Sequence, residues 1–111
     1  MEGTLSGGKK WASGITDGHY DPDGYVAIRI NVNNLKFRPR IINCKVKDHE
    51  GIIICAFYNA SFYNDSIMCT TPSSARLERG VVITDNSFNI PISLKSVLGH
   101  HVYEVTWEAY E

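Results

Sequence analysis

The clearest pattern in the chain is the alternation of apolar and polar residues over positions 103–109. Tyr103, Val105, Trp107 and Ala109 fall on one side, and the residues between them are polar. A period of two that is rich in β-branched and aromatic residues predicts a half-buried β-strand.

The same kind of signal recurs along most of the chain. Residues 26–32 carry Val or Ile at every even position, and these side chains are expected to face the core. Residues 41–58 predict an antiparallel hairpin around the turn sequence DHEG, and residues 81–92 predict a second pair of strands. Residues 72–79 are the nearest candidate for a helix, of one or two turns. We therefore predict an all-β fold, a six- to seven-stranded antiparallel β-sandwich or a barrel.

One predicted strand, residues 52–58, is apolar on both of its faces. Such a strand suits a sheet that is covered on both sides. Either a symmetric partner subunit or residues 61–79 of the same chain would provide the second cover, and the pattern does not choose between them. The face that we assign to a subunit interface consists of Ile52, Ile54 and Ala56.

Length and charge limit the classes of function. The 111 residues suffice for one domain, which we place at residues 11–111, after a Gly/Ser-containing flexible linker at residues 1–10. That linker lacks the apolar core of a secretory signal, and no apolar run approaches the 18 residues of a membrane span. With a net charge of −1 and scattered basic residues, nucleic acid is not an expected partner.

The cysteine pattern favours free thiols. Cys44, Cys55 and Cys69 form an odd set with no zinc-ligand spacing, so we expect all three to be reduced. Cys44 and Cys55 lie inside apolar strand patterns, where a free cysteine behaves as a small hydrophobic residue.

Four segments, taken in order, resemble the repeating end domains of bacteriophage tail fibres. They are KKWASG, INVNNLKFRPRIINCKV, GVVITDNSFNIPI and the final VYEVTWEAYE. The chain is also similar, more remotely, to H-type lectins. The resemblance covers residues 10–111 and implies a six-stranded antiparallel β-sandwich that assembles as a homotrimer. It also implies a location in the virion at the tip of a tail fibre made in the host cytoplasm, where loops bind a host-surface polysaccharide.

The segment TDGHYDPDGY holds the first group of candidate ligand-binding residues. Carboxylates accept hydrogen bonds from sugar hydroxyl groups, and a flat ring offers an apolar surface to the pyranose. The alternatives are simple turn formation by Asp, Pro and Gly, and a calcium site, although the spacing is not that of an EF-hand. The candidates in this segment are Asp17, His19, Tyr20, Asp21 and Asp23.

Two further segments contain candidates for the same role. Tyr63, Asn64 and Asp65 are adaptable recognition residues, or part of a loop that plugs one end of the sandwich. His100 is expected at a loop tip, whereas His101 should be partly buried with the last strand; a solvated pair and a metal site are the alternatives.

Catalysis has little support in the sequence. No nucleophile elbow and no cysteine–histidine signature is present, so we expect no enzyme activity and no cofactor. The functions that remain are a receptor-binding fibre tip, a structural module that trimerises or caps the fibre, and a free-standing lectin of a cellular organism.

Overall fold

The computed structural model describes residues 1–5, 7–22, 27–95 and 97–111, and over these residues the fold is all-β without a helix. The described residues contain no helix that is long and apolar enough to cross a membrane. Ten strands are present in these ranges, more than the six or seven predicted. They are β1 (Glu2–Thr4), β2 (Lys10–Asp21), β3 (Ala27–Val32), β4 (Ile41–Lys47), β5 (Ile53–Asn59), β6 (Ser66–Thr70), β7 (Ala75–Arg79), β8 (Val82–Ile83), β9 (Phe88–Ser93) and β10 (Tyr103–Tyr110).

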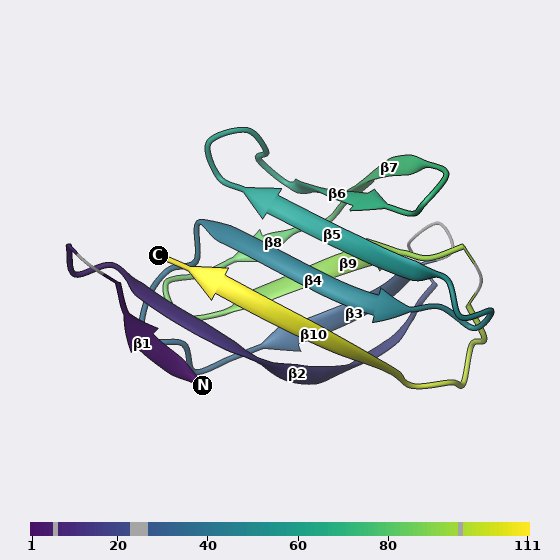
Figure 1. The fold of residues 1–111 in the computed structure, drawn as a ribbon, viewed down its shortest axis with the longest axis horizontal. Coiled ribbons are helices and arrows are strands. Elements are labelled where there is room, and N and C mark those ends of the chain that lie inside the picture. The colour runs from purple at the N-terminus through teal and green to yellow at the C-terminus, as the bar shows by residue number, and fades with distance from the viewer. Residues whose placement is uncertain (6, 23–26, 96) are drawn as a thin grey trace.

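The strands form one antiparallel sheet that curls on itself like half of a barrel (Figure 1). Their order across the sheet is β7-β6-β5-β4-β10-β2-β3-β9-β8, and β1 pairs with the free side of β2. The curl brings β6 and β7 into contact with β9, close to the other end of the strand order. The concave side of this curl holds the core.

The long strand β2 makes the curl possible because it has different neighbours along its length. Residues up to Gly18 pair with β10, whereas the last three residues of β2 pair with β3. Gly18 lies at the change of partner, where a Cβ would come within 2.6 Å of Cδ1 of Ile28. A residue without a side chain therefore allows the two parts of the sheet to approach each other.

The N-terminal residues were expected to be a flexible linker, and this is wrong for Glu2–Thr4. These residues form β1 and pair with Lys10, Trp11 and Ala12 of β2. A carboxylate oxygen of Glu2 lies 2.8 Å from Nζ of Lys36.

The last strand, β10, has the predicted half-buried pattern and a central position. It lies between β4 and β2, and its odd-numbered residues from Tyr103 to Ala109 are buried. Ile28, Ile30 and Val32 of β3 are also buried, as the alternation predicted. Val26 lies outside the described residues.

The hairpin predicted over residues 41–58 is confirmed as β4 and β5, but the interface assigned to β5 is wrong. Ile54 and Ala56 are buried inside the chain itself, and Ile52 packs partly buried against the same core. The face of β5 that points away from the core carries Ile53, Cys55 and Phe57, and all three are exposed.

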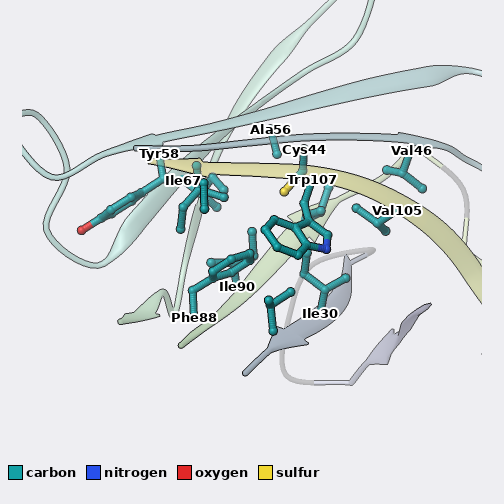
Figure 2. Close-up of a cluster of buried hydrophobic side chains, with 14 of the residues drawn as sticks. Ile30, Cys44, Val46, Ala56, Tyr58, Ile67, Phe88, Ile90, Val105 and Trp107 are labelled. Carbon is teal, nitrogen blue, oxygen red and sulfur yellow. The ribbon is translucent and has the colours of Figure 1, made fainter. Parts of the chain in front are cut away.

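The core is a continuous set of apolar side chains from most strands of the sheet (Figure 2). Trp107 of β10 lies near its centre, with its ring edge-to-face against Phe88 of β9 and the ring centres 5.6 Å apart. Pairs of this kind stabilise a core beyond the area that they bury.

The candidate helix at residues 72–79 is wrong. Its second half is the strand β7, which pairs residue by residue with β6, and Thr71 and Ser74 close the turn between them through hydrogen bonds. Serine and threonine favour such turns because their hydroxyl groups compete for backbone partners.

All three cysteines are free, as predicted, but only Cys44 and Cys69 are buried. Burial raises the pKa of the Cys69 thiol to about 11, against a smaller lowering by the backbone N–H of Ser93. Burial also raises the pKa of the Cys44 thiol, to a greater extent. Cys55 is exposed on the outer face of β5.

We therefore expect one thiol per folded chain to react with an aromatic disulfide reagent at pH 8. The reason is that thiolates are the reacting species, and the two buried thiols are both inaccessible and protonated at that pH. Absorbance during labelling of native and urea-unfolded protein measures this, with three thiols expected after unfolding. Cys55→Ser is the control and should leave the folded protein unreactive; rapid labelling of that variant would contradict the burial of Cys44 and Cys69.

Candidate functional site

A pocket of about 590 Å³ lies where β4 ends and β10 begins. Ligand pockets in proteins commonly have volumes of about 300–1,000 Å³, so this one suits a small molecule or part of a polymer. Its walls come from the end of β4, the start of β5 and the start of β10 with the loop before it. The lining residues are Lys45, Val46, Lys47, Asp48, Ile53, His101, Val102, Tyr103, Glu104 and Thr106.

The turn between β4 and β5 forms one side of this pocket, and Asp48 holds it in shape. One carboxylate oxygen of Asp48 accepts hydrogen bonds from the backbone N–H groups of Glu50 and Ile52, at 2.9 and 2.8 Å. Gly51 completes the turn with a φ of 83°, a conformation that side chains other than glycine's rarely adopt. The second carboxylate oxygen of Asp48 is buried and has no hydrogen-bond partner among the described residues. Asp48 therefore holds the turn that forms this side of the pocket.

Aromatic rings form another part of the site. The His101 ring lies edge-to-face against Tyr103, with ring centres 4.6 Å apart, and against His49 of the β4–β5 turn at 6.4 Å. Tyr103 is buried, and its hydroxyl oxygen accepts a hydrogen bond of 2.9 Å from the backbone N–H of Leu98. This contact ties the loop before β10 to the start of that strand, so the His101 ring has a fixed support.

Charged side chains complete the pocket from the outer face of the sheet. Lys45 and Lys47 alternate with the buried Cys44 and Val46 along β4, so both amino groups point outward. Lys45 lies opposite Thr106 of β10. Glu104 is also exposed and supplies a carboxylate to the same pocket lining. The site thus offers hydrogen-bond donors, an acceptor and a ring surface within one hollow.

The first predicted group of ligand residues belongs to β2 and is not a loop. Asp17 lies opposite Glu104 and His19 opposite Arg29. Asp21 is buried, with a carboxylate oxygen 3.2 Å from Nε of Arg29, so it links β2 to β3. Asp23 lies outside the described residues.

The remaining predicted residues are divided between the two ends of the sheet. The loop that carries His100 lies beside Tyr20, because a Cβ at Gly99 would be 3.8 Å from Cδ2 of Tyr20. His100 is exposed and is not among the residues that line the pocket, whereas His101, expected to be partly buried, is exposed and does line it.

Tyr63, Asn64 and Asp65 lie at the opposite end, in the loop between β5 and β6 (Figure 1). Tyr63 packs against the core and against the ring of Phe57. The backbone oxygen of Asp65 accepts hydrogen bonds from Gly80 and Val81 at 2.9 Å. These residues therefore lie apart from residues 17–21 of β2, and the binding role expected of each segment stays a prediction.

The residues that sequence reasoning missed are Lys45, Lys47, His49 and Glu104. The outward position of the two lysines was predictable, since the alternation of β4 places them on the face opposite Cys44 and Val46. Within the described parts of the chain, no group of three His, Cys, Asp or Glu side chains is arranged to hold a metal ion.

Comparison of the chain with protein-family models, with curated proteins and with solved structures gave no match in any of the three.

Proposed function

We propose that this chain is a non-enzymatic domain that recognises a surface polysaccharide through the pocket between β4 and β10. The observation that carries the proposal is the combination of Lys45, Lys47 and Glu104 with the exposed ring of His101 in one hollow of about 590 Å³. Sugars carry many hydroxyl groups, which need both donors and acceptors, and their ring faces pack against flat side chains.

The resemblance to phage tail-fibre end domains supplies the biological setting of this proposal. In that setting the curled sheet is a β-sandwich at the fibre tip of a virion, and its ligand is a host-surface glycan. Several copies at one tip, three according to the resemblance, would raise the avidity of a weak single site without any new contact.

A structural role in fibre assembly is the second candidate function, and the outer face of the sheet favours it. Phe57 and Leu77 expose 38% and 48% of their surface on neighbouring parts of that face. Exposed apolar side chains that gather in one region commonly mark a protein contact. A domain of this kind would assemble the fibre without binding a glycan.

The adjacent histidines provide a matched test of the carbohydrate site. We expect His101→Ala to weaken binding to immobilised bacterial lipopolysaccharides and capsular polysaccharides at least about tenfold, equivalent to about 1.4 kcal/mol. His100→Ala should change binding by less than about twofold, because His100 is exposed outside the pocket lining. Biolayer interferometry on a panel of these polysaccharides measures both variants.

The reverse result, loss with His100→Ala alone, would move the site to the loop tip. If the unmodified protein binds none of the panel, the structural role is favoured. Circular dichroism of each variant checks that folding is unchanged.

A further inference from the structure

The strand β7 is an open edge of the sheet. Among the described residues it pairs only with β6, and four of its five residues are exposed. An edge strand presents backbone N–H and C=O groups that have no partner in the sheet, and it can pair with a strand of another chain. The edge at the other end of the strand order, β8, is only two residues long. β7 is therefore the stronger candidate for such pairing.

The sequence of β7, Ala-Arg-Leu-Glu-Arg, is complementary to itself in the antiparallel direction. If two copies pair with Leu77 on the two-fold axis, each Arg76 lies opposite Glu78 of the second copy. Side chains directly opposite in an antiparallel pair share a face and lie about 4.5–5.5 Å apart at Cβ, within reach of an ion pair. A two-fold contact requires this kind of self-complementarity.

Within the described residues, one carboxylate oxygen of Glu78 has only a long ion pair and no hydrogen bond. It is 9% exposed, and its Oε2 atom is buried without a hydrogen-bond partner among the described residues. Nε of Arg76 is 3.9 Å from that atom, which is too long for a hydrogen bond. A buried acceptor without a hydrogen bond is unfavourable, so an added guanidinium beside this carboxylate would be favourable.

The opposite face of β7 continues an apolar row across the sheet. Leu77 lies opposite Met68 of β6, and Met68 lies opposite Phe57 of β5. A two-fold axis at Leu77 places this row next to the same row of the second copy. The apolar surface is then continuous across the contact between the two β7 strands.

We propose that β7 pairs antiparallel with β7 of a second copy of this chain, in the register that sets Arg76 opposite Glu78. Backbone hydrogen bonds and the joined apolar rows supply the affinity, whereas the two ion pairs select the register, because charge complementarity contributes more to specificity than to affinity. Contacts of this limited size are typically weak, so the dimer is expected in the micromolar range. The proposal does not depend on the carbohydrate site, since β6 lies between β7 and the part of β5 that lines that site.

Charge reversal with mixing tests this register. We expect sedimentation velocity of the unmodified chain to show a concentration-dependent rise from 12.4 kDa to about twice that mass. Arg76→Glu alone sets Glu against Glu, and Glu78→Arg alone sets Arg against Arg, so each variant should dimerise at least about tenfold more weakly. An equimolar mixture of the two variants restores both opposite-charge pairs, and its dimer affinity should return to within about threefold of the original.

Arg79→Glu is the matched control, because it reverses the charge of a neighbouring arginine that faces Ala75 in this register. This variant should keep the dimer affinity within about twofold of that of the unmodified chain. Three results would each overturn the proposal. The unmodified chain could remain a monomer at several hundred micromolar, or its assembly could keep the same mass in both charge-reversal variants. The equimolar mixture of the two variants could also stay dissociated. Circular dichroism confirms that the variants are folded.

Discussion

The substitution Ile54→Asp is expected to unfold the domain, with a loss of more than about 4 kcal/mol in the free energy of unfolding. Ile54 has no exposed surface and lies opposite Val46 in the β4–β5 hairpin, on the face that packs into the core. A carboxylate at that position lies among the apolar side chains of the core and must lose its hydration. A loss of this size is comparable to the whole stability of a small domain, about 5–15 kcal/mol.

The neighbouring residue Ile53 provides the matched control. It is the same residue type on the same strand, but it is 39% exposed on the opposite face. Ile53→Asp should lower the stability by less than about 1 kcal/mol. Urea denaturation followed by far-ultraviolet circular dichroism compares the two variants. Equal losses, or a folded Ile54→Asp variant that merely changes its assembly state, would show that Ile54 does not face the core.

The substitution Trp107→Ala is expected to lower the free energy of unfolding by about 3–5 kcal/mol while leaving the fold recognisable. The Trp107 side chain lies in the middle of the buried cluster, against Phe88 (Figure 2). It also lies beneath Gly14 of β2, where a Cβ would be 3.0 Å from its ring. Removal of the indole leaves a cavity among strands that are held in place by their own backbone pairing, so the cavity can collapse only in part.

Circular dichroism is the suitable measurement for Trp107→Ala, because the chain has only one other tryptophan to report by fluorescence. Ile15→Ala is the control: Ile15 lies on β2 as well but is 63% exposed, and its loss should cost less than about 0.5 kcal/mol. If Trp107→Ala lowers the free energy of unfolding by less than about 1 kcal/mol, the Trp107 side chain does not belong to the core.

The strands with one apolar and one polar face were predictable from the sequence. In β10 and β3 the alternation alone identified both the strand and its buried side, because burial of one face requires a period of two. The DHEG turn similarly located the β4–β5 hairpin.

The orientation of β5 was not predictable from its own residues, since both of its faces are apolar. The information lies in the strand that it pairs with: Ile53 lies opposite Lys47, and Ile54 lies opposite Val46. Directly opposite residues share a face, so the polar residues of β4 identify the outward side of β5.

The candidate site was harder to predict because binding residues come from separate parts of the chain. Asp17 and His19 looked like loop residues because aspartate and glycine are frequent in turns, but pairing with β10 and β3 holds them in an extended strand. The pocket itself joins the β4–β5 turn to the loop before β10, and nothing local in either segment indicates that they meet. The β7 segment was similarly ambiguous, since only its pairing with β6 excludes a helix.

The central position of β10 has a consequence for the order in which the sheet is completed during synthesis. Both of its neighbours, β2 and β4, leave the ribosome before any residue of β10 does. Until then each of the two strands has an unpaired edge where β10 will lie, and such edges are prone to pair with the wrong strand. A nascent chain that stalls before residue 103 therefore has an incomplete sheet with a gap in its middle, and two unpaired strand edges face that gap.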